Sequence, residues 1–274
     1  MIALARRATH AALRRLHTQP LDVATALEHE RRTLADERDR ALATDIVLGA
    51  LRWQAAIDHL IAWAGRRPID RFDEDVLDVL RAAAYQVLYL DRVPAAAAVN
   101  DAVNLTKAIR RSSAASAVNA ILRALVRHRH RLPLPGPDEG LDFLSITLSH
   151  PRWLVERWVT RLGEARARAW IDFNNGAPPL TLRANRLRAG RDALAADLRD
   201  HGIASEPTRF APDGLHVQAS LPRVAGLVPP ERFIAQDESS QLVGAFVAAS
   251  PGSLVLDTCA APGTKTTQLA CDVG

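Results

Sequence analysis

The sequence predicts a multi-domain protein in which an all-α bundle precedes a small α/β segment and the opening of a second α/β domain. In roughly the first 130 residues, apolar side chains recur only at helical spacing. Strand-like alternation begins only after the proline-rich stretch Leu132–Pro137. The length of 274 residues and a hydrophobic content of 48% supply enough apolar material for more than one core, which excludes general disorder.

Five helices are expected in the first part, and each has a pattern that supports it. The segment 41–63 places Leu42, Ile46, Trp53 and Ile57 on one face, and Pro68 follows it. Acidic residues at 73–75 favour a helix start, because the N-terminal end of a helix carries a positive partial charge. The other helices are predicted over 2–17, 95–110 and 114–127, and the elements together over 1–132 form a compact bundle.

The remainder divides into a linker and two α/β parts. The composition of 133–145 is typical of a linker, 146–228 is the α/β middle segment, and 229–274 opens a further domain. Helices are expected over 152–173, 188–201 and 239–249. Strands are expected at Leu180–Ala184, 215–218 and 233–235, and a buried strand at Ser253–Leu256.

Several classes of protein are excluded at this point. No apolar run approaches the ~20 residues of a membrane helix, and the arginine-bearing start is unlike a secretory signal. Two cysteines, Cys259 and Cys271, cannot build a disulfide framework. The nine histidines include no pair at metal spacing with cysteine partners. We therefore expect a cytoplasmic monomer that holds no metal and has no membrane partner.

Positive charge is concentrated at the end of the helical part. No acidic residue occurs over 102–137, where seven basic residues stand: Lys107, Arg110, Arg111, Arg123, Arg127, Arg129 and Arg131. Such a stretch attracts polyanions, and phosphate contacts dominate nucleic-acid affinity. A solvated helix end whose arginines favour the negative end of the helix dipole explains the charge equally well.

Residues 253–270 form the pattern of a ligand-binding corner. A hydrophobic strand would end at Asp257, the loop that follows is rich in small residues, and a helix is expected from Thr264. Small residues let a ligand approach the backbone, and free N–H groups at a helix start bind anions. The spacing fits neither a P-loop nor a G-x-G-x-x-G fingerprint, because position 258 is threonine and Gly263 is the loop's only glycine. An ordinary strand-to-helix turn remains the alternative.

Two segments here resemble motifs of RNA cytosine-C5 methyltransferases. Asp257-Thr-Cys-Ala-Ala-Pro-Gly-Thr-Lys-Thr266 is similar to their S-adenosylmethionine loop, D-x-C-A-A-P-G-G-K-T, and 236–242 resembles their Q-D-x-S-S-Q segment. Further segments resemble the RsmB/Sun/Fmu branch of the family. Those in the helical part, such as Asp91-Arg-Val-Pro94 and Val118–Arg123, look like its NusB-type RNA-binding domain, and Leu182-Arg-Ala-Asn185 looks like its middle segment.

The resemblance implies methylation of cytosine C5 in 16S rRNA by a Rossmann-like S-adenosylmethionine-dependent domain, with 16S rRNA as partner. The cofactor would be bound by Cys259, Ala260, Ala261, Pro262, Gly263, Thr264 and Lys265, of which Thr264 departs from the family's glycine. RNA contacts would come from the seven basic residues together with Arg183 and Asn185; caps and turns are the alternative role of those last two.

The family's chemistry uses two cysteines that lie beyond its cofactor loop. One adds to C6 of the cytosine and makes C5 nucleophilic, and the other helps to release the product. Neither Cys259 nor Cys271 matches these motifs, so we expect the family's nucleophilic cysteine to lie beyond Gly274. No catalytic residue is then expected in this chain, and no methyl transfer by it alone. A non-catalytic NusB-type RNA-binding protein, acting in transcription antitermination or ribosome assembly, is the alternative.

Overall fold

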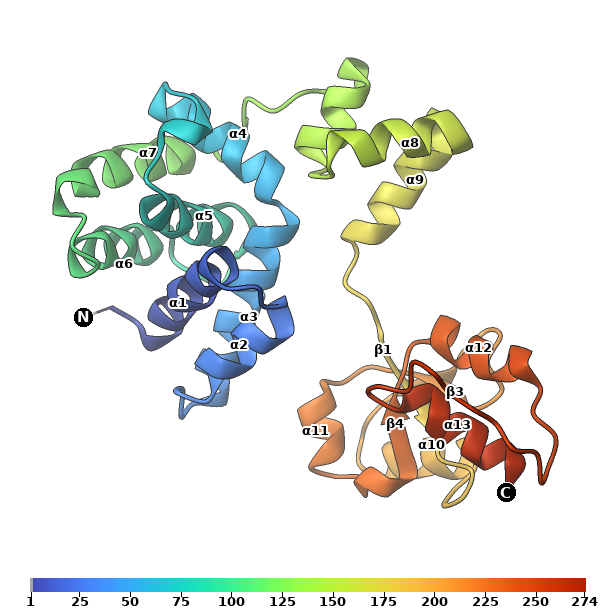
Figure 1. Cartoon of the computed structure of the whole chain (residues 1–274). Helices are drawn as coiled ribbons and strands as arrows, with labels where there is room; N and C mark the ends of the chain where they lie inside the picture. The colour runs from blue at the N-terminus through green and yellow to red at the C-terminus, as the bar shows by residue number, and fades with distance from the viewer. Residues whose placement is uncertain (1) are drawn as a thin grey trace. The chain divides into compact units, whose positions relative to one another are not determined.

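The computed structural model describes residues 2–274 and divides the chain into two compact units, which meet at Gly176 and Ala177. Figure 1 shows the first unit as helices only and the second as helices around a small sheet. No helix within residues 2–274 combines the length and the apolar character that crossing a bilayer requires.

The first unit confirms the predicted helical bundle. Helix α5 (Glu74–Tyr89) lies at its centre and contacts α1, α3, α4, α6 and α7 (Figure 1). Asp73 caps α5 by accepting a hydrogen bond from the Val76 N–H, and most of the helix is buried. The other helices are α1 (Leu4–Thr18), α2 (Val23–Arg31), α3 (Glu37–Arg52), α4 (Gln54–Gly65), α6 (Ala95–Ala108) and α7 (Ala115–His128), with short turns η1 (Ile69–Arg71) and η2 (Ser112–Ala114).

The prediction of one continuous helix over 41–63 is wrong. The structure has two helices there, α3 and α4, because Trp53 leaves the helical conformation at φ −99° and ψ 20°. This break lets the Trp53 ring stack on Tyr89, with ring centroids 5.1 Å apart. Periodicity alone does not indicate this break, because the apolar spacing continues across it.

Residues 133–176 complete the first unit. They form η3 (Pro137–Glu139), the single π-helical turn η4 (Phe143–Thr147), α8 (Arg152–Leu162) and α9 (Glu164–Asn175). The segment predicted as a linker, 133–145, is held in place by contacts with its neighbours. The Thr147 hydroxyl donates to the Pro135 carbonyl at 2.7 Å. Phe143 and Leu144 pack in a small hydrophobic core with residues of α8 and α9. The four-part division of the chain itself stays a prediction.

The second unit is built on a four-stranded antiparallel sheet in the order β2-β3-β1-β4. Leu182 of β1 lies opposite Leu215 of β3 and Ala235 of β4, and Leu194 and Leu198 of α10 pack in the same core. The elements are β1 (Leu180–Ala184), α10 (Arg191–Asp200), β2 (Ser205–Pro207), β3 (Gly214–Val217), α11 (Leu221–Ala225), η5 (Pro230–Arg232), β4 (Phe233–Ala235), α12 (Glu238–Val247) and α13 (Thr264–Val273). The α/β character and the predicted helix from Thr264 are confirmed.

The prediction of a buried strand at Ser253–Leu256 is wrong. Leu254 is 102% and Leu256 85% exposed, and the segment belongs to no described ladder. A strand is stable only when its backbone groups pair with a neighbour. Among the described residues this segment pairs with no strand, since the sheet consists of β2, β3, β1 and β4 alone.

Candidate functional site

A groove lies between α6 and α7 on the first unit. Its volume is about 880 Å³, and its floor is made by apolar side chains such as Val99, Val103 and Val126. Three of the predicted cations line it: Lys107 from the end of α6, and Arg123 and Arg127 from α7. The groove therefore combines apolar surface with cations from two different helices.

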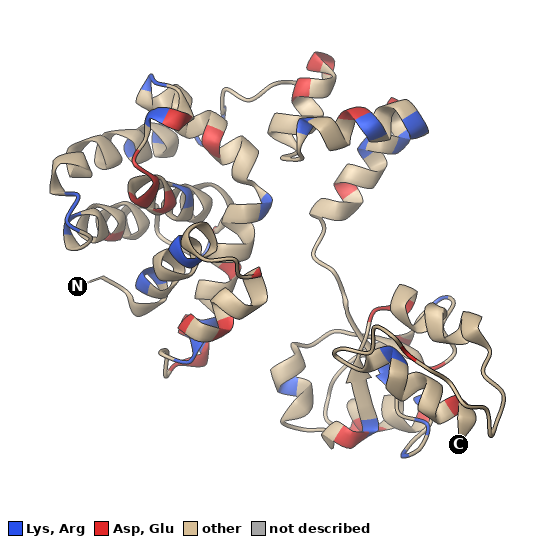
Figure 2. Cartoon of the chain, viewed as in Figure 1, with Lys and Arg blue, Asp and Glu red and all other residues tan. Residues whose placement is uncertain are grey.

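The charges around the groove are available to a ligand. All seven predicted basic residues are exposed, and in Figure 2 the ribbon of α6 and α7 shows blue but hardly any red. Within residues 2–274, Lys107, Arg123 and Arg127 form no ion pair. Arg111 differs, because it pairs with Asp73 at 3.1 Å and Asp75 at 3.0 Å, which neutralises its charge locally.

The structure gathers part of the predicted basic set and adds polar groups that the sequence did not single out. Arg110, Arg111, Arg129 and Arg131 lie outside the groove lining. Asn100, Ser116 and Asn119 lie within it, and Asn119 accepts a hydrogen bond from Arg123 at 3.0 Å. Asn119 stands four residues before Arg123, and Asn100 and Ser116 stand seven residues before Lys107 and Arg123. These spacings could have revealed them, because residues four or seven apart share one helix face.

In the second unit, Asp257 closes the loop that precedes α13. One carboxylate oxygen accepts the Cys259 N–H at 3.0 Å, and the other accepts the Thr266 hydroxyl at 2.7 Å. These two bonds, the Thr266 bond first, lower the pKa of Asp257 below its usual value. The loop is thus held at both ends although most of it is exposed.

The loop conformation shows whether a threonine is tolerated at position 264, where the similar family has glycine. Gly263 has φ +101°, a value that L side chains rarely adopt, while Thr264 is the first residue of α13 and is not among the residues with positive φ. The threonine therefore stands where a side chain is tolerated. No side chain caps α13, so its first N–H groups stay free to bind an anionic group.

These features fit the methionine end of S-adenosylmethionine, the cofactor that the resemblance implies. Residues 259–262 lie exposed around a backbone that small side chains leave accessible, and the free N–H groups suit a carboxylate. Cys259 is exposed. Lys265 is also exposed, and its charge acts on Asp257.

Arg183 corrects the predicted RNA set. Its side chain is 0% exposed and donates hydrogen bonds inside the second unit, so it cannot contact RNA in this structure. The side chain of Asn185 is used internally as well, since its amide donates to the Glu231 carbonyl at 2.8 Å. Among residues 2–274 no cluster of His, Cys, Asp or Glu has the arrangement of a metal site.

The last residue of the described chain, Gly274, belongs to the end of α13 and adds no chemical group to the loop. It is the C-cap of that helix, and its N–H donates to the Ala270 carbonyl at 3.3 Å. The expectation that the family's nucleophilic cysteine lies beyond Gly274 concerns no residue of this structure, so it stays a prediction.

Comparison with known proteins gives two domain matches. Residues 4–127 match the NusB family, and residues 150–223 match the RsmF/B-like methyltransferase ferredoxin-like domain. Among curated proteins, the chain is 35% identical over 236 residues to ribosomal RNA small subunit methyltransferase B of Pseudomonas putida, covering 85% of this chain and 52% of that protein. It is 30% identical over 235 residues to a probable ribosomal RNA small subunit methyltransferase B of Bacillus subtilis, with the same coverage.

The chain spans about half the length of these curated relatives. Among solved structures, that of PH0851 superposes with a TM-score of 0.74 at 20% identity, covering 98% of this chain and 61% of that one. At this identity the likeness shows a shared fold.

Proposed function

The chain joins a NusB-family domain to an RsmF/B-like ferredoxin-like domain, and on that premise we propose that it takes part in the methylation of cytosine C5 in 16S ribosomal RNA. The relatives' names support small-subunit ribosomal RNA as the substrate class. The observation that carries the proposal within this chain is the Asp257–Thr266 loop, in which Gly263 takes a left-handed conformation and the start of α13 is uncapped.

The two units have different parts in this proposal. The groove between α6 and α7 binds RNA through Lys107, Arg123 and Arg127, which form charge contacts with phosphates. In the second unit, residues 259–265 hold the amino-acid end of S-adenosylmethionine, which supplies the methyl group when bound. The protein acts in the cytoplasm as a monomer.

The cysteines of the chain do not provide the thiolate that attack on C6 of cytosine needs. Cys259 belongs to the cofactor loop, and the Cys271 thiol donates to the Thr267 carbonyl at 3.2 Å within α13. We therefore expect the chain alone to bind its ligands without transferring a methyl group.

The test uses the whole chain with a 16S rRNA transcript and an unrelated RNA of equal length. Fluorescence anisotropy measures RNA affinity, calorimetry measures binding of S-adenosylmethionine, and labelled cofactor measures transfer. We expect tighter binding of 16S rRNA, heat on addition of the cofactor, and no transfer. Equal affinity for the two RNAs would refute the RNA assignment. RNA binding without any cofactor heat would favour the non-catalytic NusB-type alternative.

A further inference from the structure

Arg183 connects the sheet to the helix that follows the proposed cofactor loop. It projects from β1, and its side chain is buried with 0% exposure. One of its terminal nitrogens, Nη2, donates to the Thr264 carbonyl at 3.2 Å and to the Thr267 hydroxyl at 3.0 Å, both in the first turn of α13. The Thr267 hydroxyl in turn donates to the Thr264 carbonyl at 3.1 Å, so the three groups form a closed set of bonds.

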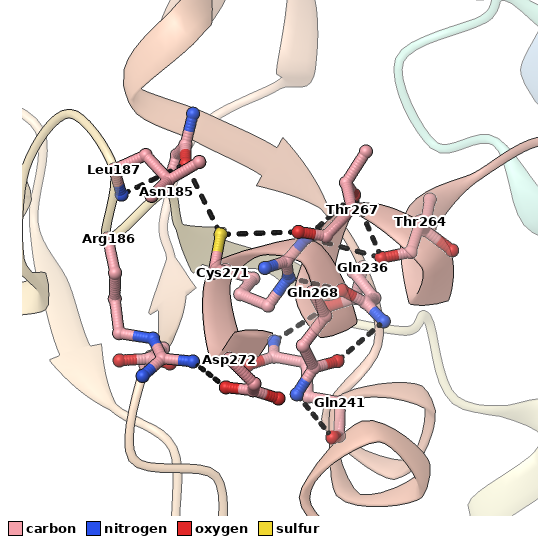
Figure 3. Close-up of polar contacts among 12 residues, drawn as sticks. Asn185, Arg186, Leu187, Gln236, Gln241, Thr264, Thr267, Gln268, Cys271 and Asp272 are labelled. Carbon is pink, nitrogen blue, oxygen red and sulfur yellow. Dashed lines mark hydrogen bonds and ion pairs between the residues drawn. The ribbon is translucent and has the colours of Figure 1, made fainter. Parts of the chain in front are cut away.

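Three buried glutamines extend this set to α12, and Figure 3 shows them around α13. Gln236 accepts the Nε–H of Arg183 at 2.6 Å and donates weakly to Gln268 at 3.4 Å. Gln268 donates to the Gln241 carbonyl at 2.8 Å, and Gln241 donates back to the Gln236 carbonyl at 2.9 Å. The first and last residues of the Q-D-E-S-S-Q segment are thus both buried and both engaged with the support of α13.

The charged guanidinium of Arg183 donates its hydrogen bonds to neutral acceptors. Within residues 2–274 no carboxylate lies at ion-pair distance from it, since Asp213 and Asp272 pair with Arg186 instead. Burial lowers the pKa of Arg183, yet an arginine keeps its charge in proteins. Its hydrogen bonds are therefore charge-assisted and stronger than bonds between neutral groups, which suits a fixed geometry.

Glycine at position 244 of α12 leaves room for this arrangement. A Cβ at Gly244 would lie 2.4 Å from the amide carbon of Gln268. Since Gln268 is buried, its amide could not move aside freely. The close approach of α12 and α13 thus depends on the absence of a side chain here.

We propose that Arg183 is a positioning residue that sets the cofactor loop through the first turn of α13, with Gln236, Gln241 and Gln268 as its buried support. The chain of contacts runs from β1 through Arg183 to Thr264 and Thr267, and from the neighbouring Thr266 to Asp257 at the other end of the loop. The Q-D-E-S-S-Q segment then supports α13 through its two buried glutamines. The part that concerns the cofactor rests on the proposed function, whereas the positioning of α13 does not.

Hydrogen–deuterium exchange on the whole chain without cofactor tests the positioning directly. Arg183→Gln should speed amide exchange in residues 267–270, whose N–H groups are bonded within the helix, about tenfold, because charge-assisted bonds to the first turn are lost. Exchange in α5 should not change. Arg188→Gln is the matched control, since Arg188 is exposed and forms no ion pair among the described residues.

Two further variants perturb the same contacts from other sides. Thr267→Val removes one acceptor of Arg183 at an exposed position, so it keeps the core intact and decides the question if Arg183→Gln does not fold. Gly244→Ala displaces Gln268 and should speed exchange in the same peptides. Arg183→Lys keeps the charge but not the planar fork, so we expect an intermediate rate.

The outcomes separate the positioning role from a general structural one and from the cofactor assignment. Faster exchange confined to 267–270, with S-adenosylmethionine binding weakened about tenfold, supports the proposal. Wild-type exchange in folded Arg183→Gln, or equal acceleration throughout the second unit, overturns it. If the wild-type chain gives no heat with the cofactor while the exchange pattern holds, the cofactor assignment fails and the positioning of α13 stands.

Discussion

The three groove cations should set the salt dependence of RNA binding. Lys107, Arg123 and Arg127 line the groove without ion pairs among the described residues, so each can replace a counterion on a phosphate. Each such contact contributes a slope of about −0.7 for single strands and about −0.9 for duplex when log affinity is plotted against log salt concentration. Replacing all three by Gln should therefore make the slope shallower by about 2 to 3.

This change in slope is large enough to measure. Between about 50 and 200 mM KCl, the affinity of the wild-type chain should fall about 20- to 40-fold more than that of the triple variant. Fluorescence anisotropy with a labelled 16S rRNA fragment at four or more salt concentrations gives the slope. Arg38→Gln is the control for each single groove variant, because Arg38 is exposed on α3 and forms no ion pair among the described residues, so its replacement removes one positive charge outside the groove.

Two results would refute the reasoning. An unchanged slope in the triple variant would show that the groove cations meet no phosphate. A slope lost equally in Arg38→Gln and in each groove single variant would show that RNA responds to net charge and not to this surface. Arg111→Gln should change the slope less than the groove variants, since Arg111 is engaged by Asp73 and Asp75.

Three further predictions concern stability. Burial raises the pKa of Asp78 from 3.8 to about 6 against the attraction of His17, so ionisation of this carboxyl opposes folding. Between about pH 4 and 6.5 the unfolding free energy of the wild type should fall by about 2 kcal/mol relative to Asp78→Asn in urea unfolding, and parallel pH curves would contradict this. Gly49→Ala would place a Cβ 1.9 Å from the Tyr85 ring and should cost about 1–3 kcal/mol; an unchanged melting temperature would contradict that packing. Leu254→Ser should change stability by less than about 0.5 kcal/mol, and a larger loss would mean that Leu254 is buried in solution.

Local patterns predicted those elements whose causes are local. Helix α5 follows from Asp73 and the acidic residues at its start, and β1 follows from the alternation in Leu180–Ala184. The break at Trp53 could not be predicted, because the apolar spacing continues across it and the stacking of Trp53 on Tyr89, 36 positions away, leaves no local signal. The strand expected at 253–256 failed for a similar reason: its apolar pattern does not show whether another strand pairs with it, and among the described residues none does.

The loop proposed to bind the cofactor could be singled out from the sequence because its residues are contiguous, whereas the residues that support it could not, because they are far apart in the sequence. The motif over 257–266 holds the closing bonds from Asp257 and the turn at Gly263 within ten positions. Arg183 lies more than 80 positions away from Thr264, and nothing within Leu180–Ala184 indicates a partner in α13.

The error at Arg183 has a physical cause in how a strand presents its two faces. The RNA role expected for Arg183 came from the resemblance, and the alternation in Leu180–Ala184 predicts a strand without showing whether one or both of its faces are covered. Leu182 and Ala184 do pack in the core with α10, but Thr181 and Arg183 on the opposite face are buried as well. A cation on a covered face must find acceptors, because an unpaired buried charge is costly. On a sheet with one exposed face, an arginine at this position of the strand would be free to contact RNA. On a sheet covered from both sides, it must instead bind the element that packs on its face, and here that element is the first turn of α13.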